Sequence, residues 1–131
     1  MDSVLCLTRN GKGGIRAQKE AIRIAKDRGD SLVFLFVADS SFLNKLAAPI
    51  VVDIKEVLES MGRFILSAAI ERASAEGVNS VSLIRYGVWR TVLLNIVSEI
   101  DPTIIIIGHL EGNPSCIEKA EMENSLYSLR E

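Results

Sequence analysis

Leu32-Val33-Phe34-Leu35-Phe36-Val37 is a run of six apolar residues without a polar interruption. A short apolar run rich in β-branched and aromatic residues is typical of a strand that is buried on both faces. Such strands occur in parallel sheets, which carry helices on both sides. The segment therefore predicts an internal strand of an α/β protein.

The sequence on either side of this run continues the alternation of strands and helices. Short apolar segments predict three further strands, over residues 4–7, 81–86 and 103–107. Apolar residues at three- and four-residue spacing predict three helices, which begin near residues 15, 54 and 88 and end before Gly29, Gly77 and Asp101-Pro102.

A fourth helix is predicted from Ser115. Ser115 and Glu118 have the spacing of a capping box, and Pro114 precedes them, as is common at a helix start. The thiol of Cys116 would then lie near a helix N-terminus, which lowers the pKa of a redox-sensing cysteine, or it simply packs in the first turn. No fifth strand is predicted, because residues 127–131 are few and polar.

The order of elements predicts the fold class. Strands that alternate with helices give an α/β fold of three layers, with an open parallel sheet of about four strands and helices on both faces. We expect this Rossmann-like arrangement to form one domain over residues 1–131.

Composition narrows the classes of function. The chain has 131 residues, 48% of them hydrophobic, and a net charge of −2, so it lacks the basic excess of nucleic-acid-binding and membrane-surface proteins. Cys6 and Cys116 lie far apart and in no motif, which argues against a disulfide framework. The opening residues 1–4 carry an acid where a signal peptide needs a base, so we expect a cytoplasmic protein.

Two glycine-bearing loops are the candidate ligand site. In open parallel sheets the ligand lies beyond the carboxyl ends of the strands, where the winding direction reverses. Residues 8–14 follow the first strand, and residues 108–115 follow the fourth. Both loops lead to predicted helix N-termini, which bind anions well. Each also has a purely structural interpretation, as a strand-to-helix turn.

Three stretches carry a resemblance to a known family: Phe36-Val37-Ala38-Asp39, Arg85-Tyr86-Gly87, and Asp101-Pro102-Thr103-Ile104-Ile105-Ile106-Ile107-Gly108. With the order of elements, they make nearly the whole chain resemble the universal stress protein family. In its nucleotide-binding members, the glycine after the fourth strand begins a G-x-x-G loop, which is followed nine residues later by G-S or G-T. These residues cradle the phosphates of ATP, while an acid after the first strand and backbone near a Val of the second strand hold the adenosine.

The sequence departs from that pattern at three places. Gly108 and Gly112 have three residues between them instead of two, and Met122-Glu123 stands where G-S or G-T is expected. The segment Thr8-Arg9-Asn10 contains no carboxylate. The resemblance therefore implies a regulatory, homodimeric protein with a degenerate pocket for ATP, ADP or AMP, and no metal other than magnesium bound to the nucleotide.

The candidate ligand-binding residues come from the two loops and from the end of the second strand. Asp39 could form a hydrogen bond with a ribose hydroxyl, or it could form a turn. His109, the sole histidine, could form a hydrogen bond with a ribose, or it could have a structural role at the surface. The full set is Thr8, Arg9, Asn10, Gly11, Lys12, Val37, Asp39, Gly108, His109, Gly112, Asn113 and Ser115.

No catalytic residue is predicted, because no nucleophile stands with a base and no metal-ligand cluster appears. Two alternatives to nucleotide-dependent regulation stay open. One is a homodimer or partner-docking module that binds no nucleotide. The other is a weak nucleotide hydrolase that uses residues 10–14 as its phosphate loop.

Overall fold

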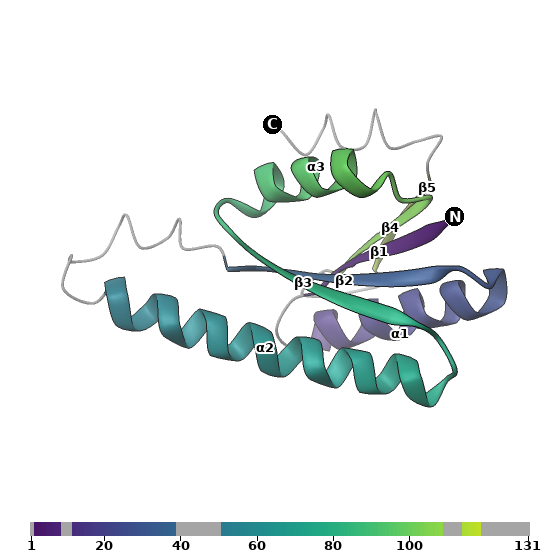
Figure 1. Ribbon diagram of the computed structural model, residues 1–131, viewed down its shortest axis with the longest axis horizontal. Coiled ribbons are helices and arrows are strands. Elements are labelled where there is room, and N and C mark those ends of the chain that lie inside the picture. The colour runs from purple at the N-terminus through teal and green to yellow at the C-terminus, as the bar shows by residue number, and fades with distance from the viewer. Residues whose placement is uncertain (1, 9–11, 39–50, 109–113, 119–131) are drawn as a thin grey trace.

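The computed structural model describes residues 2–8, 12–38, 51–108 and 114–118 (Figure 1). It confirms the four predicted strands and the first three predicted helices. In chain order the elements are β1 (Ser3–Leu7), α1 (Lys12–Arg28), β2 (Ser31–Ala38), α2 (Val51–Ala75), β3 (Ser80–Tyr86), α3 (Trp89–Ile100), β4 (Ile104–Ile107) and β5 (Ser115–Glu118).

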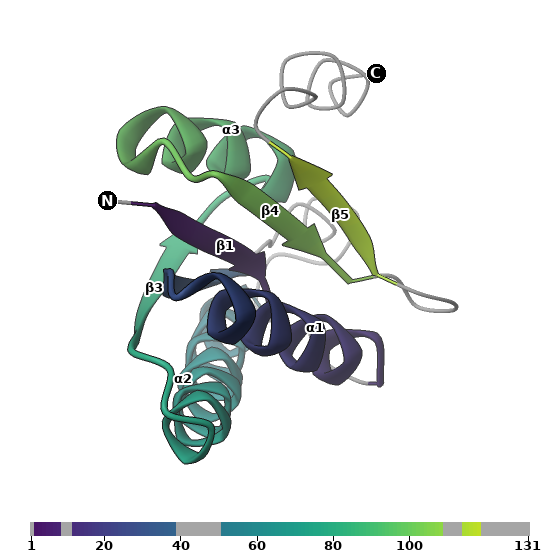
Figure 2. The ribbon, with the colours of Figure 1, turned by 90° about the vertical axis from the view of Figure 1, so that its right-hand side faces the viewer.

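The strands form one sheet in the order β3-β2-β1-β4-β5. β1 to β4 run parallel to one another, and β5 pairs with β4 in the antiparallel direction. α1 and α2 lie side by side on one face of the sheet and α3 lies on the other (Figure 2). The predicted three-layer α/β fold is thus confirmed, and the long apolar run is the internal strand β2.

The core has two layers because the side chains of β2 alternate between the two faces. Phe34 packs into the layer between the sheet and helices α1 and α2, whereas Leu35 packs into the layer under α3. Both side chains are fully buried. After its first residue, β2 is therefore apolar because each face of the sheet is covered by a helix.

β5 corrects two sequence-based predictions. Residues 115–118 form a strand rather than the start of a helix, so the predicted fourth helix at Ser115 and the predicted lack of a fifth strand are both wrong. The pairing runs from Ile104 opposite Glu118 to Ile107 opposite Ser115. A capping residue stabilises a helix by only about 1 kcal/mol, whereas this pairing forms backbone hydrogen bonds along one side of the buried strand β4. Residues 119–131 of the predicted helix lie outside the described residues.

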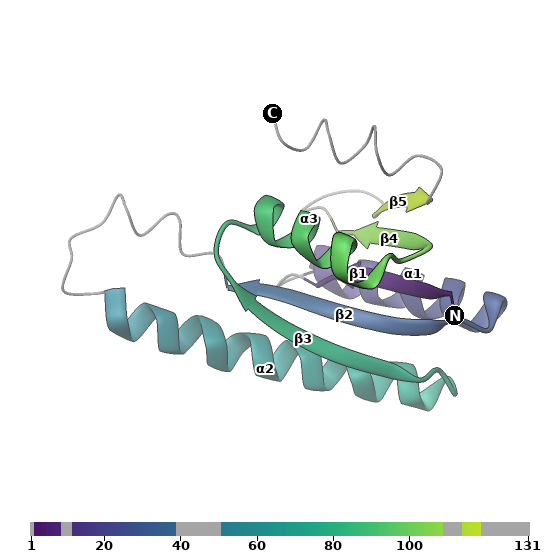
Figure 3. The same cartoon turned by 45° about the horizontal axis from the view of Figure 1, so that its top comes forward.

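β3 forms the opposite border of the sheet (Figure 3). Leu32 donates its backbone N–H to the carbonyl of Asn79 at 3.1 Å, so alternate residues from Asn79 onward face β2. The carbonyl of Ile84 consequently faces the open side. There it accepts a hydrogen bond from Nη1 of Arg85 at 2.9 Å. One side chain of β3 thus occupies an acceptor on its own open edge.

Gly62 marks a close approach between α2 and the sheet. A Cβ built on Gly62 would lie 2.6 Å from Cε1 of Phe36 on β2. We expect Gly62→Ala to lower the free energy of unfolding by about 1–3 kcal/mol through overpacking, although alanine favours a helix by about 1 kcal/mol over glycine. Urea denaturation measures the change.

A double-mutant cycle identifies the cause of that loss. Phe36→Leu should make room for the new methyl group, so the double variant should lose less stability than the sum of the two single variants. Strictly additive losses would show that the contact between residues 62 and 36 is not responsible.

Candidate functional site

The direction of winding reverses at β1. The chain builds outward from β1 to β2 and β3 and then returns to place β4 on the other side of β1. Ligands of open α/β sheets bind at such a reversal, outside the carboxyl ends of the strands. The register pairs Leu7 with Ile107, so Thr8 and Gly108 leave the sheet next to each other. We refer to this end of β1 and β4 as the β1/β4 crevice.

Gly108 packs directly against the first turn of α1. A Cβ at this position would lie 2.6 Å from the carbonyl oxygen of Gly13 and 3.1 Å from Cβ of Ala17. Only a residue without a side chain allows the helix to approach the end of β4 so closely. The contact therefore places the N-terminus of α1 at the crevice. The first N–H groups of a helix have no partner within that helix, and they favour an anion.

The structure brings part of the predicted site together. Ser115 pairs with Ile107, so Ser115 borders the end of β4 where Gly108 begins. Lys12 is the first residue of α1. Val37 lies near the carboxyl end of β2, but it packs on the face that α3 covers. The remaining predicted residues lie outside the described residues: Arg9, Asn10, Gly11, Asp39, His109, Gly112 and Asn113.

Thr8 is tied to the sheet. Its side chain is only 1% exposed, and its N–H donates to the carbonyl of Leu35 at 2.7 Å. Its hydroxyl donates to the carbonyl of Cys6 at 3.4 Å. These contacts hold the first residue after β1 in line with the strand. A contact between Thr8 and a ligand stays a prediction.

Sequence reasoning missed Gly13 as the contact of Gly108. Small residues at positions 13, 14 and 17 lie on one side of a helix, because residues three and four apart are neighbours. That pattern opposite a glycine at the end of a strand is the signal that could have indicated a close approach between the two backbones.

The two cysteines have different environments. Burial raises the pKa of the Cys6 thiol to about 12, and the hydrogen bond from Thr8 offsets part of that rise. Cys116 is exposed on β5, so its predicted position at a helix N-terminus is wrong. We therefore expect a thiol reagent to modify Cys116 in the folded protein and Cys6 only after unfolding.

Cys6 also predicts a dependence of stability on pH. In the unfolded chain the thiol ionises near its ordinary pKa of 9.0, whereas in the folded protein it stays protonated until about pH 12. The contribution of Cys6 to stability is therefore complete below pH 9 and falls as the pH rises toward 12, by up to about 1.4 kcal/mol per pH unit. Urea denaturation from pH 8 to 11 measures the slope. Cys6→Ala should flatten it, and an equal slope in that variant would contradict the assignment.

Within the described ranges, no group of three or more acidic, histidine or cysteine side chains is placed to hold a metal ion. Of the helices in the same ranges, none is both long and apolar enough to cross a membrane.

Comparison with known proteins identifies the family. The fold is similar to the universal stress protein UspA from Lactobacillus plantarum, with a TM-score of 0.71 and 16% identity over 81% of this chain and 75% of that one. It is also similar to a universal stress protein family member from Burkholderia pseudomallei, with a TM-score of 0.70 and 21% identity over 98% and 90% of the two chains. A universal stress protein in complex with cAMP gives a TM-score of 0.58 and 20% identity over 79% and 69%.

A search of curated proteins finds no match. The model of the universal stress protein family, in contrast, matches residues 1–114 of the 131. The chain therefore belongs to the universal stress protein family, as the resemblance of its sequence predicted.

Proposed function

We propose that this protein is a cytoplasmic regulator that binds an adenine nucleotide, or a related small molecule, in the β1/β4 crevice. The observation that carries the proposal is the contact of Gly108 with Gly13, which sets the N-terminus of α1 beside the end of β4. A related universal stress protein has been solved in complex with cAMP. A nucleotide complex of a related protein and a helix N-terminus that favours an anion both support the proposal.

The charges of the two loops favour a ligand with few negative charges. Lys12 and Arg16 belong to the start of α1, where the helix dipole adds to their attraction for an anion. Glu111 in the second loop repels a triphosphate. We therefore rank AMP, ADP and cyclic AMP ahead of ATP. The role is binding rather than catalysis, so ATP incubated with the protein should release no phosphate above the background rate.

Calorimetric titration with ATP, ADP, AMP and cyclic AMP tests the proposal, after mass spectrometry of any molecule that co-purifies. We expect a micromolar Kd for at least one nucleotide, and a Kd at least tenfold higher in the double variant Lys12→Ala, Arg16→Ala. Arg28→Ala is the control for loss of a positive charge from α1, because it removes one at the far end of the helix, about 24 Å from Lys12 at 1.5 Å per residue. Failure of all four nucleotides to bind would refute the proposal.

The open edge of β5 supports a homodimer. β5 pairs with β4 on one side, and within the described residues no strand lies on its other side. Such an edge offers unpaired backbone groups to a second copy of the chain. Sedimentation velocity should give the mass of a dimer, and Ile117→Pro, which removes a backbone donor from β5, should give a monomer. A dimer without nucleotide binding would favour the partner-docking module.

A further inference from the structure

A second cavity lies between α1 and α2, away from the crevice. The two helices run side by side under the sheet (Figure 2). Between their C-terminal halves is a space of about 590 Å³. Its lining residues come from α1, from the last turn of α2 and from the residue after α2: Lys19, Ile22, Arg23, Lys26, Asp27, Arg72, Ala75 and Glu76. Ligand pockets commonly have volumes of about 300–1,000 Å³. We call this space the α1/α2 groove.

Apolar side chains and cations both line the groove. Ile22 and Ala75 contribute hydrocarbon surface from the two helices. Lys19 and Arg72 bring positive charge to the same space, and their long stems add further apolar area. A ligand in this groove would therefore meet hydrocarbon and positive charge together.

A buried amide positions the guanidinium of Arg72. Nη1 of Arg72 donates to Oε1 of Gln18 at 2.6 Å, which links α2 to α1. Gln18 is only 1% exposed, so it is a fixed anchor. Because Gln18 is neutral, the bond orients Arg72 without cancelling its charge. A guanidinium has five N–H donors, and those not used by Gln18 suit a carboxylate.

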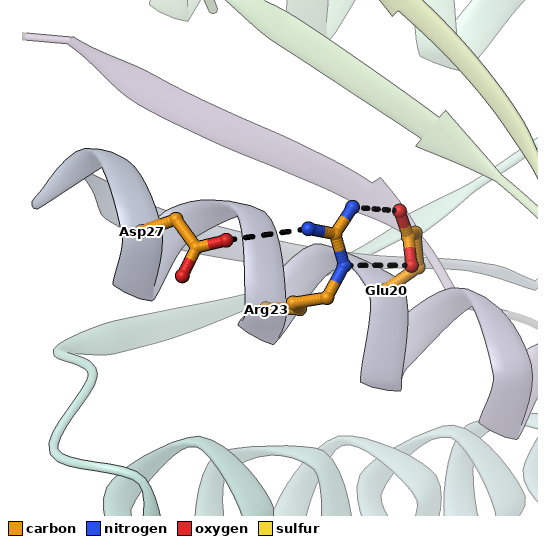
Figure 4. Close-up of polar contacts among 3 residues, drawn as sticks. All are labelled: Glu20, Arg23 and Asp27. Carbon is orange, nitrogen blue, oxygen red and sulfur yellow. Dashed lines mark hydrogen bonds and ion pairs between the residues drawn. The ribbon is translucent and has the colours of Figure 1, made fainter.

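The other cations of the groove are already paired. Arg23 contacts Glu20 at 2.5 Å and Asp27 at 3.2 Å along α1 (Figure 4), and the hydrogen bond from Arg23 lowers the pKa of Glu20. Lys26 forms an ion pair with Glu76 at 3.0 Å. Among the described residues, Lys19 and Arg72 form no ion pair with a carboxylate. The groove therefore has two uncompensated positive charges.

Two carboxylates limit the charge of a ligand. Asp27 and Glu76 border the same groove, and they would repel a polyanion such as a nucleoside triphosphate. One carboxylate has two oxygens, which can meet Arg72 and Lys19, and an apolar body covers the hydrocarbon surface. Lys19 lies in the middle of α1, so compensation of a helix dipole does not account for it.

From these contacts we propose that the α1/α2 groove binds a small amphipathic monoanion, a carboxylate on an apolar body. Arg72 anchors the carboxylate, Lys19 supplies the second charge, and Ile22 and Ala75 contact the apolar body. The site is distinct from the β1/β4 crevice, since its lining residues on α1 begin at Lys19, whereas the crevice is formed by the first turn of the helix.

Titration of octanoate into the full ¹⁵N-labelled chain, followed by NMR, tests the proposal. Shifts should concentrate at residues 19–27 and 72–76. Acetate has the charge without the apolar body, and octan-1-ol has the apolar body without the charge, so each should bind at least tenfold more weakly. Shifts elsewhere in the chain, or equal affinity for octan-1-ol, would overturn the proposal.

Charge-removing variants identify the anchors. Arg72→Gln and Lys19→Gln should each raise the Kd for octanoate at least tenfold. Lys19→Gln alters an exposed side chain, so it tests the site even if Arg72→Gln perturbs the fold. Arg63→Gln removes the same charge from α2 outside the groove, where Arg63 pairs with Glu59, and it should leave the Kd unchanged. Equal affinity in all three variants would overturn the proposal.

A saturating concentration of ADP separates this site from the proposed nucleotide site. The Kd for octanoate should be the same with and without ADP. Displacement of octanoate by ADP would show that both occupy one site, and it would overturn the inference while leaving the proposed function intact.

Discussion

Gly108→Ala is expected to lower the free energy of unfolding by about 2–3 kcal/mol, at the upper end of the usual cost of overpacking. The new methyl group would lie 2.6 Å from the carbonyl oxygen of Gly13, which is backbone and cannot rotate away. Relief of that clash requires the first turn of α1 to move off the end of β4. Nucleotide affinity should therefore fall together with stability, as urea denaturation and calorimetry on the same variant would show.

Gly29→Ala is the control for the change from glycine to alanine. Gly29 has a φ of 71°, and a Cβ there would meet no atom within 4 Å. Its substitution therefore introduces only backbone strain, at about 1 kcal/mol. It should leave nucleotide affinity unchanged. A Gly108→Ala variant as stable as Gly29→Ala would show that the contact with Gly13 is not tight.

Phe34→Ala should have the largest effect on stability, a loss of about 3–5 kcal/mol. The side chain of Phe34 is 0% exposed at the centre of the layer between the sheet and helices α1 and α2. Its removal leaves a cavity that the rigid strands on either side cannot close. The midpoint of urea denaturation measures the loss.

Phe64→Ala makes the same chemical change at a position that is 77% exposed on α2. We expect it to alter stability by no more than about 0.5 kcal/mol. A similar loss at positions 34 and 64 would contradict the assignment of the core.

Most of the sheet could be predicted from the sequence because burial on two faces leaves a plain signal. β2 and β4 are apolar at nearly every position, and amphipathic helices separate the strands. β5 could not be predicted in this way. Its four residues match a helix-capping pattern, and the partner that makes them a strand, β4, becomes apparent only when the sheet is assembled.

The sequence indicated where to look for a candidate site, but not how the residues there pack. The order of the strands indicated the β1/β4 crevice and the importance of Gly108, but not the contact between Gly108 and Gly13, which depends on how α1 packs. The sequence named Thr8 as a candidate but not the bond from its hydroxyl to the carbonyl of Cys6. The side chain of a residue at the end of a strand can bond to the sheet or face the neighbouring loops, and the sequence does not determine which.

The cations of the α1/α2 groove could not be recognised as a site from the sequence, for a different reason. Lys19 follows the helical period of α1 as an ordinary surface residue, and Arg72 lies far away in the sequence on α2. The bond from Arg72 to Gln18 connects the two helices at this site. The signal that could have helped is topology, since right-handed crossovers from β1 to β2 and from β2 to β3 place both helices on the same face.

The hydrogen bond from Arg85 to the carbonyl of Ile84 has a consequence for how copies of the protein assemble. A fibre that grows by strand pairing needs two sheet edges with unpaired backbone groups on every copy, because each copy pairs with one neighbour on either side. Arg85 occupies a backbone acceptor on the β3 edge, so this edge is poorly suited to pair with another strand. The β5 edge is then the one that can pair. Two copies that pair through β5 about a twofold axis would bury the β5 edges of both copies at once, so assembly would stop at a dimer.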